Sequence, residues 1–361
     1  MEQVPESKKV SPFLVYYLII SVQVGIGVLG FQRIIAKEAG YDAWISVILS
    51  GFLIHLIIFI IYKLLELGGG DFTSIHRMIF GRKLGGFLSS VFSLYYLIAA
   101  IVIIRTYIEV IQVWMFPDYK LFWSSVLIMG LIIYIIYGGF RTITGFSFLG
   151  TILPSYLVLT FLFTIPYSDF HNLLPIFNHS WKEIMGGVFQ MGLTVIGFET
   201  LLFYYPMIKE PEKSKKYAHY AIITSTLFYL FITLLSFSYF SENQIQNTIW
   251  ATLTMWKVVQ LPFVERFEYI GIANWGLVVL PNICITLWCS AITLKRVYRL
   301  KLKKGVIAVC AICLFTVPFI DSRAKINLLN DFLSKVGFIY VFVYIPFLLV
   351  LLLIVRKVKK L

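Results

Sequence analysis

Ten long apolar stretches, nearly free of charged residues, dominate this chain of 361 residues. They cover residues 10–32, 43–62, 84–104, 121–140, 142–168, 184–208, 220–241, 269–294, 305–320 and 336–355. Most contain the roughly 20 residues that an α-helix needs to cross about 30 Å of hydrocarbon, although the ninth is short. Because the apolar runs are continuous rather than alternating over about 10 residues, they predict helices and not barrel strands.

The composition leads to the same class of protein. Hydrophobic residues make up 59% of the chain and charged residues 14%, whereas soluble domains contain roughly 45–50% apolar and about 25% charged residues. A water-soluble globule is thereby excluded. We predict an all-α integral membrane protein in which residues 1–361 form a single transmembrane domain of about ten helices.

The positions of the lysines and arginines predict how the chain is oriented in the membrane. If the N-terminus is cytoplasmic, 21 of the 31 lysines and arginines fall in inner segments, as the positive-inside rule requires. An even number of spans then places both termini in the cytoplasm. This topology and attraction to anionic membrane lipid explain the net charge of +13, so no nucleic-acid partner is required.

The segment 242–268, between the seventh and eighth stretches, is predicted to lie on the outer side of the membrane. Its apolar residues recur at helical spacing, namely Ile249, Trp250, Leu253, Trp256 and Val259. One interpretation is an interfacial helix anchored by its tryptophans. The other is a cap over an outward-facing vestibule.

Glycine clusters occur in the middle of the first and sixth stretches. Their sequences are Gly25-Ile26-Gly27 in the first and Gly197-Phe-Glu in the sixth. Glycine destabilises a helix by about 1 kcal/mol relative to alanine, so the clusters indicate either close helix packing or an interrupted helix. Interruption is favoured because the two stretches open two five-helix halves, 10–168 and 184–355. This arrangement predicts an inverted-repeat transporter fold with a site between the interrupted helices.

Glu199 is the only acidic residue within the ten stretches. Burying an ionised carboxylate at this depth costs at least about 2.5 kcal/mol, so Glu199 is expected to face the protein interior. Two roles remain open. Either the carboxyl group, bonded to interrupted-helix backbone or protonated, holds the site in shape, or it makes a structural contact with a neighbouring hydroxyl or tyrosine.

The third and eighth stretches are predicted to supply the walls of the site. Tyr95 and Ala99 are four residues apart, which places an aromatic ring beside a small residue on one helix face. Asn282 and Thr286 have the same spacing and begin a polar stripe. The alternative for this stripe is interhelical hydrogen bonding, which is common in membranes.

The sequence carries no motif of an enzyme or of a metal site. It contains no phosphate-binding loop, no G-x-S-x-G and no H-E-x-x-H. Cys310 and Cys313 form a C-x-x-C on an apolar stretch, without a histidine or a second thiol pair at metal spacing. We expect no catalysis, no cofactor and no metal.

Several motifs, taken in order, identify a family. They are Gly25-Ile-Gly-Val-Leu-Gly30 with Arg33, Arg105 with Glu109, Gly197-Phe-Glu199, Ile249-Trp250, and Glu265-Arg-Phe-Glu268. The set resembles the spore germination permease family, the B subunits of bacterial germinant receptors, within the amino acid/polyamine/organocation superfamily. The resemblance implies a LeuT-like five-plus-five inverted repeat with helices 1 and 6 interrupted. The chain departs from the family at Phe31-Gln32, where Leu-Pro is usual, and at Ala251, where proline is usual.

This resemblance implies a function. The chain would be a germinant-receptor subunit in the spore inner membrane, assembled with A and C subunits, that senses a small nutrient such as an amino acid. The carboxylate would bind N–H groups at Gly25, Ile26 and Gly27, and the ammonium would bind carbonyl groups from Val195 to Gly197. The side-chain fit would be set by Tyr95, Ala99, Ile196, Asn282 and Thr286.

Two other functions share the same sequence features. One is a secondary amino acid transporter, and the other is an assembly subunit with a vestigial pocket. Arg105 and Glu109 are predicted to have a structural or coupling role, which could be only to anchor the end of the helix. Their i, i+4 spacing at the end of the third stretch predicts an ion pair between them.

Overall fold

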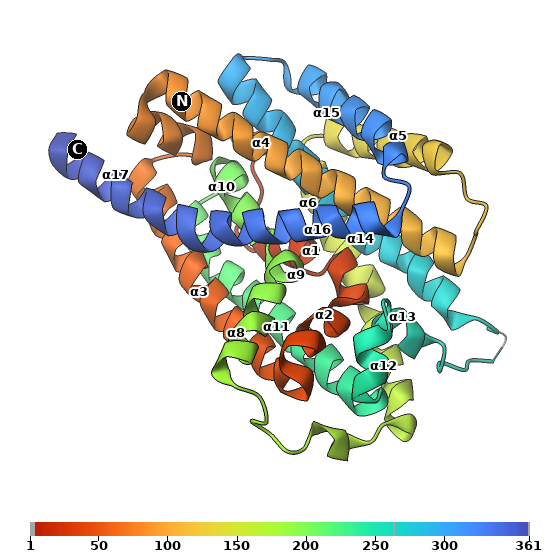
Figure 1. The fold of residues 1–361 in the computed structure, drawn as a ribbon. Coiled ribbons are helices and arrows are strands. Elements are labelled where there is room, and N and C mark those ends of the chain that lie inside the picture. The colour runs from red at the N-terminus through yellow and green to blue at the C-terminus, as the bar shows by residue number, and fades with distance from the viewer. Residues whose placement is uncertain (1–3, 263, 360–361) are drawn as a thin grey trace.

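The computed structural model describes residues 4–262 and 264–359, with the backbone but not the side chain of Leu193. Phe263 of the segment 242–268 and Lys360 of the C-terminal basic cluster lie outside the described residues. The described chain folds into helices and turns and contains no β-strand (Figure 1).

The helices form a single bundle. Those of the first half are α1 (Leu14–Gln23), α2 (Phe31–Ala39), α3 (Ala43–Gly68), α4 (Phe72–Trp114), α5 (Leu121–Tyr137), α6 (Phe140–Ile152) and α7 (Leu157–Thr160). Those of the second half are α8 (Trp181–Gln190), α9 (Gly192–Val195), α10 (Leu201–Tyr204), α11 (Lys215–Tyr239), α12 (Glu242–Asn247), α13 (Ala251–Trp256), α14 (Phe267–Tyr298), α15 (Leu302–Thr316), α16 (Arg323–Phe338) and α17 (Ile345–Lys359). Short 3-10 turns include η2 (Ile26–Leu29), η5 (Phe161–Tyr167) and η7 (Phe198–Thr200).

Seven helical segments of the described chain are long and apolar enough to cross a membrane. α1 and α5 are shorter apolar helices, and the sixth predicted stretch is divided among α8, α9 and α10. The predicted class, an all-α membrane protein, is therefore confirmed. The number of ten spans stays a prediction.

α14 lies at the centre of the bundle. It is the most buried of the seven segments and packs along α4 and α6, and Figure 1 shows α4 and α14 running beside each other. Gly81 bends α4 with a φ of +78°, which glycine adopts without the steric clash of a Cβ. Large apolar side chains such as Phe52 and Leu127 are exposed on the outside of the bundle, as contact with lipid tails requires.

The helical backbone breaks near the middle of the first and sixth stretches. α1 ends at Gln23, and Val24 and Gly25 leave the helical conformation before the chain turns into η2. α9 ends at Val195, after which Gly197 has a φ of +119°. Residues with a Cβ rarely adopt that φ. Gly197 is therefore needed at the second break for its backbone conformation. At the first break Gly25 has a φ of −126° and provides space, because a Cβ there would lie 2.6 Å from Nδ2 of Asn282.

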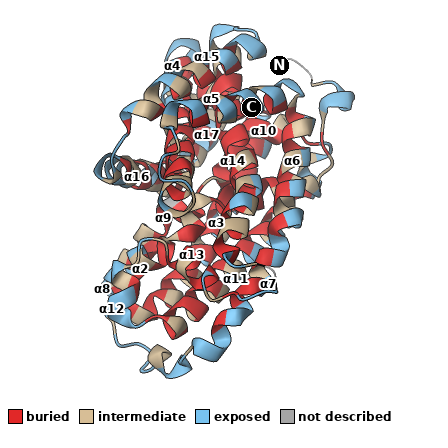
Figure 2. Ribbon diagram, turned by 90° about the vertical axis from the view of Figure 1, so that its right-hand side faces the viewer, coloured by how far each residue is buried: buried red, intermediate tan, exposed pale blue. Residues whose placement is uncertain are grey.

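Both termini lie at one end of the bundle, and α2, α8 and α12 lie at the other end (Figure 2). The inner parts of the two broken stretches are joined near the termini. The N–H of Val10 donates to the carbonyl of Met207 over 2.8 Å, and the N–H of Lys209 donates to the carbonyl of Val10 over 2.8 Å. The assignment of this end to the cytoplasm stays a prediction.

The segment 242–268 contains α12 and α13, which pack on the bundle at the end opposite the termini. Trp256 is fully buried, donates from Nε1 to Oγ1 of Thr160 over 3.1 Å, and stacks on Phe161. Thr252 donates to the carbonyl of Val28 over 2.7 Å. Trp256 therefore packs against protein in this structure, and the choice between a cap and an interfacial helix stays a prediction.

Candidate functional site

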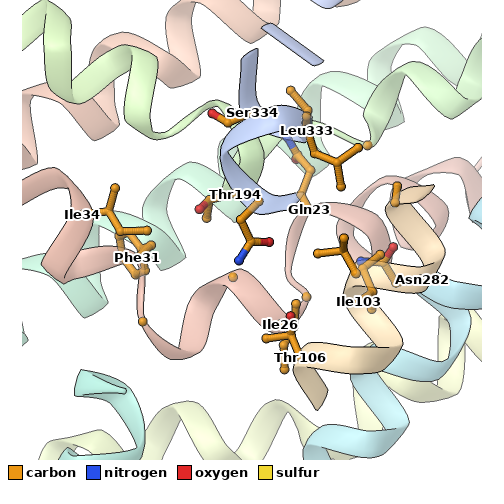
Figure 3. Close-up of a pocket in the computed structure, with 18 of the residues that line it drawn as sticks. Gln23, Ile26, Phe31, Ile34, Ile103, Thr106, Thr194, Asn282, Leu333 and Ser334 are labelled. Atoms are coloured by element: carbon orange, nitrogen blue, oxygen red, sulfur yellow. The ribbon is translucent and has the colours of Figure 1, made fainter. Parts of the chain in front are cut away.

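A cavity of about 180 Å³ lies between the two helix breaks. Ten of the thirteen predicted site residues line it: Gly25, Ile26, Gly27, Tyr95, Ala99, Ile196, Gly197, Glu199, Asn282 and Thr286. Figure 3 shows Gln23 and Ile26 at the first break and Asn282 of α14 around this space. The fold thus brings together the two glycine clusters and the two predicted walls.

The first break presents backbone donors to the cavity. The N–H groups of Gly25, Ile26 and Gly27 make no hydrogen bond to another described residue, as expected where a new helical turn begins. In contrast, Nδ2 of Asn282 donates to the carbonyl of Val22 over 3.2 Å, and Nε1 of Trp275 donates to the carbonyl of Gly25 over 3.2 Å. The first break is therefore suited to an anionic group.

The second break presents fewer open acceptors than expected. The carbonyl of Val195, which does not line the cavity, accepts from Nε2 of Gln23 over 2.7 Å. The carbonyl of Gly197 accepts from the hydroxyl of Thr200 over 2.6 Å. Among the described residues no donor bonds to the carbonyl of Ile196. Of the three carbonyl groups predicted to bind an ammonium group, that of Ile196 is the most accessible to a ligand.

Glu199 is 1% exposed and lies against the second break. Its Oε2 accepts from the N–H of Gly197 over 2.6 Å, and its Oε1 accepts from the hydroxyl of Tyr96 over 3.4 Å. The contacts expected for both interpretations are present, since the carboxyl group bonds to the broken-helix backbone and contacts a tyrosine, and its role stays a prediction. The carboxyl group satisfies a donor that the break would otherwise leave unpaired.

The polar stripe of α14 has two uses. Asn282 lines the cavity and also bonds to α1, so interhelical hydrogen bonding and cavity lining both apply to it. The hydroxyl of Thr286 donates to the carbonyl of Asn282 within its own helix over 3.0 Å. The hydrogen of this hydroxyl group is therefore used within α14, and towards a ligand its oxygen can act only as an acceptor.

Sequence reasoning missed two hydroxyl groups that line the cavity. The side-chain oxygens of Thr106 and Ser334 are buried and have no hydrogen-bond partner in the described chain. Thr106 lies seven residues after Ala99, on the same helix face, so helical spacing alone would have found it. Ser334 lies on α16, which begins at Arg323, before the predicted stretch 336–355. Because charged residues lie around Ser334, that part of the helix was not included in the predicted apolar stretch.

Gln23 was missed as well, although it directly precedes the first glycine cluster. Its side chain is 1% exposed and connects three segments. Nε2 donates to Val195 at the second break, and Oε1 accepts from the hydroxyl of Ser225 on α11 over 2.7 Å. A polar side chain in the middle of an otherwise apolar stretch was the available signal.

Replacing Gln23 with leucine is expected to lower the free energy of unfolding by about 1–3 kcal/mol, because the buried carbonyl of Val195 loses its donor. The melting temperature of the purified variant measures this effect. The exposed Gln260 forms no hydrogen bond to another described residue, so Gln260→Leu is the matched control. An unchanged melting temperature for Gln23→Leu would show that the bridge between the breaks does not stabilise the bundle.

The expected ion pair between Arg105 and Glu109 is wrong. Oε2 of Glu109 instead pairs with NH1 of Arg323 over 2.6 Å, and Nε of Arg105 donates to the carbonyl of Ile320. Neither residue lines the cavity. Spacing predicted that the two side chains share a helix face. Other partners are supplied by Ile320, between α15 and α16, and by Arg323, the first residue of α16. Arg323 itself lines the cavity and lies over the ring of Trp250 at 5.0 Å.

Comparison with known proteins identifies relatives along nearly the whole chain. A family model described as spore germination protein matches residues 9–326. Spore germination protein GerQB of Bacillus cereus is 43% identical over 349 residues, which are 96% of this chain and 97% of that protein. Spore germination protein A2 of Bacillus subtilis (strain 168) is 21% identical over 99% of both chains.

Solved transporter structures share the fold. A substrate-bound, outward-open Na⁺-coupled sialic acid symporter superposes with a TM-score of 0.68 at 14% identity, covering 92% of this chain and 77% of that one. MhsT in complex with L-phenylalanine gives a TM-score of 0.59 at 14% identity, covering 95% of this chain and 98% of that one. The resemblance inferred from the motifs is thereby confirmed: the chain belongs to the spore germination protein family, with a transporter fold.

Proposed function

We propose that this chain is the membrane subunit of a spore germinant receptor that binds an amino acid between the two helix breaks and signals to partner subunits. The cavity bounded by both breaks is the observation that carries the proposal. The relatives named for spore germination support the biological process. The spore inner membrane as location, and the A and C subunits as partners, belong to the same proposal.

The size and polarity of the cavity suit an amino acid. Its volume of about 180 Å³ is below the roughly 300–1,000 Å³ of pockets for drug-sized ligands. The free N–H groups of Gly25, Ile26 and Gly27 would hold a carboxylate, and the carbonyl of Ile196 would accept from an ammonium group. The unpaired hydroxyls of Thr106 and Ser334 add polar contacts, because buried polar groups are normally hydrogen-bonded.

Tyr95, Ala99 and Thr286 would set which side chain fits, since they line the same cavity. Ligand binding at the breaks would favour one arrangement of the bundle over another. Such a population shift requires a difference in ligand affinity between the two arrangements. The partner subunits would respond to the favoured arrangement.

A thermal-shift screen of the purified chain against single amino acids tests the binding step. A ligand at about 100 times its Kd is expected to stabilise the protein by roughly 2.7 kcal/mol. Ala99→Phe should remove this shift because the ring enters the cavity. Val91→Phe, eight residues earlier on the exposed face of the same helix, should retain it. If no amino acid raises the melting temperature of the unmodified chain, the proposed ligand class is wrong.

The second candidate is a secondary amino acid transporter. It is favoured by the coverage of more than nine-tenths of this chain by transporter structures. Uptake of the stabilising amino acid by proteoliposomes that contain only this chain separates the two functions. A receptor binds without accumulation, whereas a transporter accumulates the amino acid.

A further inference from the structure

A second and larger cavity lies at the end of the bundle that carries the termini. Its volume is about 1040 Å³, and it shares no lining residue with the cavity between the helix breaks. Its walls are residues 4–8, the start of α4, the turn between α5 and α6, and the end of α14. We call it the inner basic cavity, because the positive-inside rule predicts that this end faces the cytoplasm.

Positive charge is concentrated in the inner basic cavity. Six basic residues line it: Lys8, Arg77, Arg141, Lys295, Arg296 and Arg299. Asp71 is the only acidic residue among the described lining residues, and its Oδ2 is already paired with Nε of Arg296 over 3.1 Å. A cleft lined by charges of one sign concentrates counter-ions and raises their local concentration. The cavity therefore attracts anions.

Arg77, Arg141 and Arg296 are among the basic side chains that structural contacts hold in place. NH1 of Arg141 donates to the carbonyl of Ser7 over 2.9 Å. NH1 and NH2 of Arg296 both donate to the carbonyl of Phe203 over 3.1 Å, which ties α14 to α10. NH2 of Arg77 donates to the carbonyl of Arg296 over 2.8 Å. The walls of the cavity are thus cross-linked, so the cations are arranged before any ligand arrives.

Two buried polar groups in this cavity have no partner in the described chain. They are Oγ1 of Thr73, a residue that is 2% exposed, and Nε of Arg77. Buried donors are normally hydrogen-bonded, so each unpaired donor calls for an explanation. Both residues line the cavity, but the two atoms themselves are shielded from it, so the charged ends of the basic side chains are the groups that a ligand would meet.

We propose that the inner basic cavity binds a phosphate-bearing anion. The basic side chains approach from α4, the α5–α6 turn, α14 and the N-terminal segment, so a ligand must accept hydrogen bonds from several directions. A tetrahedral phosphate has oxygens in these directions and matches guanidinium groups well. Phe140 and Trp288 line an apolar part of the cavity, which leaves room for a non-polar portion of the ligand.

The phosphate can come from a soluble compound of the cytoplasm or from the headgroup of an anionic phospholipid. Both sources offer the same chemistry to the cavity. The proposal is independent of amino-acid binding, because the two cavities have no lining residue in common. Its test therefore needs no knowledge of the nutrient.

Calorimetric titration of the full chain with sodium pyrophosphate, in nanodiscs of zwitterionic lipid, measures the binding. Sodium chloride at equal ionic strength is the reference. The variant K8Q/R299Q removes two exposed cations of the cavity whose side chains form no hydrogen bond or ion pair with another described residue. It is expected to raise the Kd for pyrophosphate at least about tenfold, because two charge-assisted contacts are lost.

The control variant K216Q/K357Q removes the same charge from exposed positions outside the cavity. Its Kd is expected to stay within about twofold of the unmodified chain, since distant exposed charges are screened by salt. If both variants lose the same affinity for pyrophosphate, binding depends on diffuse surface charge, and the proposed site in the inner basic cavity is wrong. The absence of saturable binding to the unmodified chain would overturn it as well.

Nanodiscs that contain anionic phospholipid identify the source of the phosphate. If the headgroup occupies the cavity, anionic lipid should raise the apparent Kd for pyrophosphate in the unmodified chain and have little effect in K8Q/R299Q. If the natural ligand is soluble, the lipid composition should leave the Kd of the unmodified chain unchanged.

Discussion

Replacing Gly25 with tryptophan is expected to abolish amino-acid binding while the bundle stays folded. A Cβ at Gly25 would lie 2.6 Å from Nδ2 of Asn282, the far end of a flexible side chain. The indole beyond it would occupy the cavity of about 180 Å³ and block the N–H groups of the first break. We expect the affinity to fall more than about 100-fold, which corresponds to about 2.7 kcal/mol.

The thermal shift by the stabilising amino acid and the germination of spores that carry the variant measure this loss. Gly130→Trp is the matched control, because a Cβ at this position on α5 has no heavy atom within 4 Å. Co-purification with the partner subunits reports whether the variant still assembles. A Gly25→Trp protein that assembles and responds to nutrient like the unmodified chain would remove the binding site from between the breaks. Ala99→Phe blocks the same cavity from another wall if the tryptophan variant fails to accumulate.

Replacing Glu199 with leucine is expected to lower the free energy of unfolding by at least about 2 kcal/mol. The buried N–H of Gly197 would lose its hydrogen-bond acceptor. The hydroxyl of Tyr96 would lose its contact with the carboxyl group as well. A buried donor left unpaired costs about 1–3 kcal/mol. The shape of the second break would change with it, so amino-acid affinity should fall together with stability.

Glu199→Gln separates hydrogen bonding from charge, because the amide oxygen can still accept from Gly197. We expect its melting temperature to stay close to that of the unmodified chain and well above that of Glu199→Leu. Glu66→Leu, at an exposed position on α3, controls for the loss of a carboxylate elsewhere. Equal melting temperatures for Glu199→Leu and the unmodified chain would contradict a structural role for this carboxyl group.

Much of the fold was predictable because membrane insertion constrains sequence strongly. A helix in lipid must form all its backbone hydrogen bonds internally and can hold few charged side chains. The absence of charged residues therefore predicted the position of nearly every span. The glycine clusters were informative for a related reason. Glycine adopts the φ of +119° found at Gly197, whereas other residues rarely do. The interruption of the helix could therefore be predicted from the glycine in the sequence.

Contacts between segments that are distant in the sequence could not be predicted from local patterns. The pairing of Glu109 with Arg323, rather than with Arg105, depends on where the chain between α15 and α16 lies. The start of α16 at Arg323 was missed because the helix extends beyond the apolar stretch into a segment that contains charged residues. Ser334 was missed for the same reason.

The sequence by itself determined that this chain is a bundle of membrane helices with two glycine breaks. Long segments without charged residues and glycines at the breaks are local properties, which can be recognised within one stretch of sequence. Only the tertiary structure decided that the breaks face one cavity, that Gln23 connects them and that six basic side chains converge on a second cavity. The physical reason is that hydrogen bonds and cavities between helices depend on how the helices are rotated and shifted against each other, which no single stretch encodes.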